Sequence, residues 1–383
     1  MWCNIFASVT HGLHTQIYVQ LVNMNSLKSK MFLNSGRQYC KFLLHPKKFL
    51  KITNNKPLSQ HSKSFSTQTK ENPSSYSIEE ITIPNGPQYG YEIACKVWRG
   101  TGGTSSSSEP PIVCVHGWLD NANTFDTLLP KLMRPGRTFY AFDLPGHGFS
   151  SHIQASHYNS HVESHLGIHR MVQYLKTDKI TLLGHSMGAE AAVMYAGSFP
   201  DGIHKVVTLD GVNPNFKDCA QSVYHFVNAL MEVEAIIAKS PLPNPTTYDA
   251  LQARIIKVRE GMVTAEGCKA LLGRGVVKVA GTNDMYRFSH DLKLRMHPGM
   301  AMLSTEQMSI FCENVSAPLL VIKAQDNDPF SLDASHNFQT AMENAKKRNK
   351  DMKVEFYLAK GNHHVHLNEP EMVANIISTF LDS

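Results

Sequence analysis

The sequence lacks any run of apolar residues long enough for a membrane helix. Such a helix needs about 18 consecutive apolar residues, and the longest runs here, around Val113 and Val321, have the length of buried strands. Paired cysteines are also missing, because the seven cysteines are scattered and none forms a CxxC pair. Disulfide frameworks and zinc sites need paired or clustered positions. We therefore expect no integral membrane association, no metal site, and reduced structural thiols in an intracellular compartment.

Acidic residues are absent from the first part of the chain. Residues 1–70 contain no Asp or Glu but ten Lys and Arg side chains. Without these ten, the chain has 27 basic and 32 acidic residues, so the net charge of +5 hides a mildly acidic body. An acidic body argues against nucleic-acid binding.

This basic leader, rich in Ser and Asn, is typical of a mitochondrial presequence, and residues 61–67 resemble a matrix-processing site. We expect residues 1–73 to lie outside the fold and to direct the protein to mitochondria. The alternatives are a disordered tail, or an upstream extension before a true start at Met24 or Met31. The protein would then be cytoplasmic or peroxisomal.

From residue 76 onward, short apolar runs alternate with helical patterns, which predicts a largely parallel sheet with helices on both faces. The expected strands are residues 78–83, 91–98, 111–115, 138–142, 180–183, 206–209, 319–322 and 354–358. The expected helices include residues 164–175, 187–198 and 371–381.

One long interval, residues 213–316, shows no clear strand and only helical stretches such as 223–238 and 248–260. In open α/β sheets, ligands bind at the carboxyl ends of the strands. An insertion after one strand and before the next therefore predicts a helical cap that roofs the pocket. The sheet domain is expected to consist of residues 74–212 and 317–383.

The strongest chemical signal is Gly-His-Ser-Met-Gly at residues 184–188, between an expected strand and an expected helix. This context is what the G-x-S-x-G nucleophile elbow requires. The turn is so sharp that side chains at 184 and 188 would collide, so both positions need glycine. Strain would hold the Ser186 hydroxyl toward the pocket, and the backbone N–H of Met187 would point at a developing oxyanion.

A second signal is His116-Gly117-Trp118 at the end of the expected strand 111–115. A His-Gly pair after this strand turns the chain under the site and offers the next backbone N–H, that of Trp118, as a second oxyanion donor. For the His116 side chain we expect only a structural role in the turn. His147 is expected to be a turn residue at the edge of the pocket.

A serine nucleophile needs a neighbouring imidazole to remove its proton. The chain has 20 histidines, so position is what distinguishes them. His363 follows the last expected strand, and its place after the serine suits this kind of fold. We therefore assign His363 as the base, with His364 and His366 as competitors.

The acid of the triad is ambiguous in the sequence. The usual place is the turn after residues 319–322. The position expected for the acid lies between Asp326 and Asp328, so neither aspartate occupies it. Asp210, at the end of the strand 206–209, is another carboxylate at the carboxyl edge of the sheet. We favour Asp210, with Asp326 next; either would hold the imidazole tautomer and stabilise the imidazolium.

These segments together, residues 116–121, 143–148, 184–188 and 361–370, resemble the serine hydrolase-like (Kraken-type) branch of the α/β-hydrolases. The resemblance covers the chain from about residue 76 to the C-terminus. It implies the α/β-hydrolase fold, with a mostly parallel eight-stranded sheet and a helical cap. It also implies a carboxylic-ester or related acyl hydrolase without a cofactor. Ala189 departs from the common elbow pattern, in which a second glycine is frequent.

We expect a serine hydrolase that forms an acyl-enzyme on Ser186 with a small-molecule acyl substrate. Epoxide and haloalkane hydrolases of this fold use Asp at the elbow, so Ser186 argues against them. A thioesterase or acyltransferase would share the same triad and is the alternative enzyme. A catalytically silent binding protein is the alternative from another class, since a fold alone never proves activity.

Overall fold

The computed structural model describes residues 76–84, 90–102, 109–153, 160–211, 244–295, 303–326 and 332–383, together with Met231 and Ala235. The predicted leader, residues 1–73, lies outside the described residues, as does most of the expected helix at 223–238. None of the described helices is both long and apolar enough to cross a membrane.

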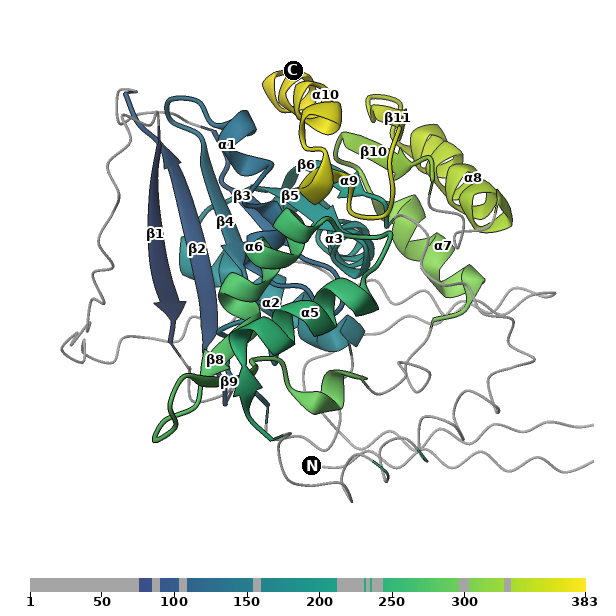
Figure 1. Cartoon of the computed structure of the whole chain (residues 1–383). Helices are drawn as coiled ribbons and strands as arrows, with labels where there is room; N and C mark the ends of the chain where they lie inside the picture. Colours follow the sequence, from purple (N-terminus) through teal and green to yellow (C-terminus); the bar gives the residue numbers. More distant parts are fainter. Residues whose placement is uncertain are drawn as a thin grey trace, which may run out of the picture. The chain divides into compact units, whose positions relative to one another are not determined.

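The main sheet has eight strands in the order β1-β2-β4-β3-β5-β6-β10-β11 (Figure 1). β1 and β2 pair antiparallel, β2 and β4 pair antiparallel, and all other pairs are parallel. The predicted mostly parallel eight-stranded sheet is confirmed. Its strands are β1 (Tyr76–Ile83), β2 (Ile93–Gly100), β3 (Ile112–Val115), β4 (Thr138–Phe142), β5 (Ile180–His185), β6 (Ile203–Leu209), β10 (Leu319–Ala324) and β11 (Val354–Ala359).

Helices cover both faces of this sheet. The α-helices whose bounds lie within the described residues are α1 (Leu129–Leu132), α2 (Ser160–Leu175), α3 (Met187–Ser198), α5 (Tyr248–Val258), α6 (Ala265–Gly275), α7 (Thr305–Asn314), α8 (Leu332–Arg348), α9 (Val365–Asn368) and α10 (Glu371–Asp382). The 3₁₀ helices are η1 (Ala122–Phe125), η2 (Pro200–Gly202) and η4 (Leu292–Arg295).

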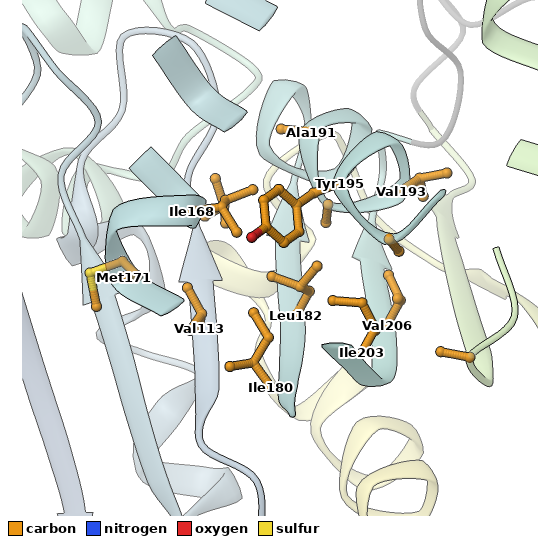
Figure 2. Packing of buried hydrophobic residues seen from close by; sticks show 14 of the residues in the cluster. Val113, Ile168, Met171, Ile180, Leu182, Ala191, Val193, Tyr195, Ile203 and Val206 are labelled. Carbon is orange, nitrogen blue, oxygen red and sulfur yellow. The ribbon is translucent and has the colours of Figure 1, made fainter. Parts of the chain in front are cut away.

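The central strands form because their sequences are almost entirely apolar. Every residue of β3 and β5 is buried, which is typical of parallel strands covered on both faces. On one face, Ile168 of α2 and Tyr195 of α3 pack against Val113 and Leu182 of the strands (Figure 2). α7 and α8 contribute to the same core.

The opposite face is covered by α1 and α10. Val373, Ala374, Ile377 and Phe380 of α10 recur at helical spacing and are all buried. This spacing gives α10 one apolar stripe that packs on the sheet. The two covered faces leave the carboxyl ends of the parallel strands as the edge where side chains can converge.

The interval 213–316 contains strands that the sequence analysis did not expect. β7 (Thr246–Thr247), β8 (Val276–Lys278) and β9 (Met285–Phe288) form a separate antiparallel sheet in the order β7-β9-β8. The expectation of an interval without strands was therefore wrong. Runs of two to four residues are too short to produce a readable alternation of apolar and polar residues.

The same interval is also firmly attached to the sheet domain. Arg274 of α6 is fully buried and forms ion pairs with Asp143, which follows β4, and with Glu80 of β1. Further along, Met308 and Cys312 of α7 are buried, and Cys312 belongs to the core that contains α3 and α8. α7 therefore packs as part of the sheet domain.

Candidate active site

Ser186 lies at a sharp turn between β5 and α3, with φ 53° and ψ −123°. A positive φ is rare for a residue with a side chain and marks a strained position. A Cβ at Gly184 would lie 2.3 Å from the backbone oxygen of Gly188, which agrees with the predicted collision. A Cβ at Gly188 would instead lie 2.1 Å from the oxygen of Val115. The second glycine therefore lets α3 approach β3.

Ser186, His363 and Asp210 form one hydrogen-bonded chain. The Ser186 hydroxyl oxygen lies 2.9 Å from Nε2 of His363, and Nδ1 of the same ring lies 2.7 Å from Oδ2 of Asp210. Ser186 follows β5, Asp210 follows β6 and His363 follows β11, so all three stand at the carboxyl edge of the sheet. Such spacing allows a proton to pass from the serine to the imidazole while the carboxylate holds the ring.

Asp210 is held as a carboxylate by several donors. Its Oδ1 accepts hydrogen bonds from Nζ of Lys323 at 2.7 Å and from the backbone N–H of Ala324 at 3.0 Å. Burial alone raises the pKa of Asp210, but hydrogen bonds from His363, Lys323 and Ala324 outweigh burial and lower the pKa to about 2. Asp210 is therefore ionised at neutral pH and fixed at a position from which it orients His363.

The described competitors, Asp326, His364 and His366, make other contacts. The side chain of Asp326 is exposed, and its backbone N–H donates to the oxygen of Gly361. Asp328 lies outside the described residues. His364 and His366 are buried, and their Nε2 atoms lie 3.2 Å from Asp120 and 3.0 Å from the Thr124 hydroxyl. Of these three neighbouring histidines, His363 is the one that contacts Ser186.

The two predicted oxyanion donors are Met187, which follows Ser186 in the chain, and Trp118, which follows Gly117. Met187 is the first residue of α3, so its backbone N–H has no acceptor within the helix. Gly117 packs against the nucleophile, because a Cβ at this position would lie 3.0 Å from the Ser186 Cβ. This close approach brings the adjoining Trp118 backbone next to Ser186. The Trp118 indole, half-exposed, donates to the oxygen of Leu294 at 2.7 Å.

His116 and His147 have the turn positions that the sequence predicts. Nε2 of His116 accepts from the N–H of Leu144 at 2.9 Å, and Nδ1 lies 2.7 Å from the oxygen of Gly117. Nε2 of His147 accepts from the N–H of Leu119 at 3.2 Å. Burial lowers the pKa of both imidazoles. Both rings are therefore neutral and support the loop that carries Trp118.

This chain is similar in sequence and in structure to known proteins. Residues 110–235 match the family model described as the alpha/beta hydrolase fold. A hypothetical protein from Pseudomonas aeruginosa PAO1 has a similar structure, with a TM-score of 0.65 at 24% identity over 79% of this chain and 99% of that chain. A "Serine hydrolase-like protein" from Danio rerio is 29% identical over 295 residues, which cover 76% of this chain and 85% of the relative. "Serine hydrolase-like protein 2" from Homo sapiens is 31% identical over 319 residues, 79% of this chain and 93% of the relative. The chain belongs to the serine hydrolase-like family.

Membership of the serine hydrolase-like family confirms the predicted α/β-hydrolase fold and supports a hydrolase.

Three residues next to the candidate site were not predicted from the sequence: Lys323, Gly211 and Arg259. A Cβ at Gly211 would lie 2.1 Å from the backbone oxygen of Ser186, so the residue after Asp210 must be glycine. Lys323 could have been found from the sequence, because it is a lone Lys at the end of an otherwise apolar strand. A largely buried ammonium there needs a partner of opposite charge.

A second buried cluster adjoins the candidate site, since it includes His185, the residue before Ser186. Asp120, His185 and His364 are the one group in the described residues whose ligand atoms come close enough to hold a metal ion. The guanidinium of Arg259 already contacts this cluster, with Nη1 2.6 Å from Oδ1 of Asp120 and 3.2 Å from Nε2 of His364. The positive charge of Arg259 neutralises the carboxylate and disfavours a metal cation at the same place.

Proposed function

We propose that this chain is a serine hydrolase that cleaves a carboxylic ester or a related acyl substrate through an acyl-enzyme on Ser186. The observation that carries this proposal is the hydrogen-bonded chain from Ser186 through His363 to Asp210. A serine hydroxyl is a weak nucleophile until an imidazole accepts its proton, and the imidazole needs a partner that fixes its tautomer. Here both requirements are met by buried or half-buried groups.

In the acylation step, the Ser186 oxygen attacks the acyl carbonyl carbon and its proton moves to Nε2 of His363. The carbonyl oxygen becomes an oxyanion, which the backbone N–H groups of Met187 and Trp118 stabilise by hydrogen bonds. Asp210, ionised because its pKa is about 2, stabilises the imidazolium. The imidazolium then protonates the leaving alcohol as the carbon–oxygen bond breaks, and the acyl group stays on Ser186.

In the deacylation step, water replaces the alcohol. His363 removes a proton from this water, the resulting hydroxide equivalent attacks the acyl-enzyme, and the same two N–H groups stabilise the second oxyanion. His363 returns the proton to the Ser186 oxygen as the acid product leaves. A thiol leaving group or an acceptor alcohol uses the same residues, which is why thioester hydrolysis and acyl transfer remain the alternatives to ester hydrolysis.

The test is steady-state hydrolysis by the full-length protein of a p-nitrophenyl ester and of the matching acyl thioester, with and without an added alcohol. We expect ester turnover that falls by about 10⁶-fold, to the background, in Ser186→Ala. Faster turnover of the thioester would favour a thioesterase, and transfer of the acyl group to the alcohol would favour an acyltransferase. A folded wild-type protein that hydrolyses none of these would favour the silent binding protein.

A further inference from the structure

A short segment of the interval between β6 and β10 contacts the two loops that carry the candidate catalytic groups. We call residues 259–264 the bridging segment, residues 117–121 the Trp118 loop, and residues 361–368 the His363 loop. The bridging segment begins where α5 ends and folds back on itself, because the N–H groups of Met262 and Val263 both donate to the oxygen of Arg259. It is therefore a compact turn.

Arg259 joins this segment to the Trp118 loop. Its Nη2 donates to the oxygen of Leu119 at 3.0 Å, and its Nη1 donates to Oδ1 of Asp120 at 2.6 Å. Leu119 has φ 57°, a left-handed conformation that a residue with a branched side chain adopts only under external constraint. His147 accepts from the N–H of Leu119 on the other side. Arg259 and His147 together therefore fix both peptide groups of Leu119, directly after Trp118.

The same segment is bonded to the His363 loop. The oxygen of Gly261 accepts from Nδ2 of Asn362 at 2.9 Å. The side chain of Asn368 donates to the oxygen of Met262 at 2.9 Å and accepts from the N–H of Thr264 at 2.9 Å. His363 is the residue after Asn362, so its backbone position depends on these bonds.

The ion pair at the centre of this arrangement is buried. The side chains of Arg259 and Asp120 are 13% and 1% exposed, so solvent screens their attraction only weakly. Oδ2 of Asp120 also lies 3.2 Å from Nε2 of His364, on the His363 loop. Burial alone raises the pKa of Asp120, but Arg259 and His364 outweigh burial and hold the pKa well below its ordinary value. Asp120 is thus a permanent anion between Arg259 and the His363 loop.

We propose that Arg259 is a positioning residue that couples the Trp118 loop to the His363 loop, so that the oxyanion donor and the base keep a common geometry. The catalytic part of this inference rests on the proposed function. Arg259 does not touch the reacting atoms; it acts through Leu119 and Asp120. A rigid fork of five N–H donors can bond a backbone oxygen and a carboxylate together, whereas the ammonium of lysine is a single point charge.

The experiment compares Arg259→Met and Arg259→Lys with Arg254→Met in the full-length protein. Arg254 is an exposed arginine in α5, the helix that ends just before Arg259, and serves as the matched control. Turnover of a p-nitrophenyl ester is normalised to the fraction of molecules that a fluorophosphonate labels, so that unfolded protein does not count. We expect kcat to fall about 100-fold in Arg259→Met and about 10-fold in Arg259→Lys, with KM changed less than about twofold, because misplaced catalytic groups slow the chemical step.

A second readout, amide hydrogen exchange, does not depend on activity. We expect faster exchange in both the Trp118 loop and the His363 loop of Arg259→Met, and in the Trp118 loop of Arg259→Lys, with no change in Arg254→Met. Arg259→Lys keeps the positive charge beside Asp120, so it remains informative if Arg259→Met does not fold.

The outcomes separate the two proposals. Loss of loop protection together with an inactive wild-type protein would leave the coupling in place and contradict the proposed function. An active Arg259→Lys with wild-type kcat and wild-type exchange in the Trp118 loop would overturn the coupling and leave the proposed function in place. Faster exchange spread evenly over the whole chain would also overturn it, because Arg259 would then be a general stabilising residue.

Discussion

Asp210 and His363 lie 153 positions apart in the sequence, yet Oδ2 of Asp210 is 2.7 Å from Nδ1 of His363. Asp210 follows β6 and His363 follows β11, with β10 between the two strands. The carboxylate therefore reaches the imidazole past β10, whose Lys323 donates to the other carboxylate oxygen at 2.7 Å. In the proposed mechanism, this geometry favours Asp210 as the acid over the exposed Asp326.

Asp210→Asn is expected to lower kcat for ester hydrolysis by about 10⁴-fold, because the amide cannot stabilise the imidazolium and favours the wrong tautomer of His363. The matched control is Asp326→Asn, which alters the other candidate carboxylate and should leave kcat within about twofold. The measurement is kcat at saturating substrate for both variants. If the loss appeared in Asp326→Asn and not in Asp210→Asn, the assignment of the acid would be wrong.

Gly211→Ala is expected to impair both folding and reactivity. Its Cβ would lie 2.1 Å from the backbone oxygen of Ser186, so the new methyl group must displace the nucleophile or the end of β6. Gly202→Ala is the control, because its Cβ would have only the oxygen of Asp178 within reach, at 3.9 Å. We expect Gly211→Ala to be destabilised by about 1–3 kcal/mol in urea unfolding and Gly202→Ala to unfold like the wild type. Equal urea midpoints for the two variants would contradict the interpretation that Gly211 must be glycine.

The stability of the fold is expected to fall as the pH drops below about 6.5. Burial lowers the pKa of six described imidazoles, and for His185 the pKa falls to about 4. The six are His116, His147, His185, His204, His290 and His366. Between the ordinary pKa of 6.5 and the lowered value, the unfolded chain binds more protons than the folded chain, so the free energy of unfolding rises with pH. For His185 alone, the loss at pH 4 is about 3 kcal/mol.

Urea unfolding at pH 7.0, 5.5 and 4.5 measures this effect. The midpoint should decrease at each step, and His185→Gln should show a shallower decrease than the wild type between pH 6.5 and 4.5. A midpoint that stays constant or rises toward pH 4.5 would mean that these imidazoles are protonated in the folded state.

The basic leader, residues 1–73, carries the proposal of mitochondrial import, which rests on composition alone. A fusion of these residues to a fluorescent protein should accumulate in mitochondria and lose a segment near residues 61–67. The control replaces the ten basic residues with glutamine, which should leave the fusion in the cytosol. Equal distribution of both fusions would contradict the presequence.

The sheet was predictable because its central strands are short, continuous apolar runs between turn residues, and such runs give buried parallel strands. The elbow was predictable for a different reason. The close backbone approaches at Gly184 and Gly188 require glycine, and both glycines are visible in the sequence. Asp210 was favoured over Asp326 because of its place after a strand. In the structure, Asp210 contacts His363, whereas the side chain of Asp326 is exposed.

The contacts across the chain could not be predicted in the same way. Arg259 meets Leu119 and Asp120 only because the path of α5 and α6 brings them together, and no periodicity in the sequence encodes that path. Strands β7 and β8 have two and three residues, too few for a pattern.

The most direct test of an activated serine is the reaction of the folded, full-length protein with a fluorophosphonate, followed by peptide mass spectrometry. We expect one phosphonyl adduct on the peptide that contains Ser186, lost in Ser186→Ala and strongly slowed in His363→Gln, because only a serine beside a base reacts. Absence of an adduct on folded wild-type protein, or an adduct that persists in Ser186→Ala, would contradict the assignment of Ser186 as the nucleophile.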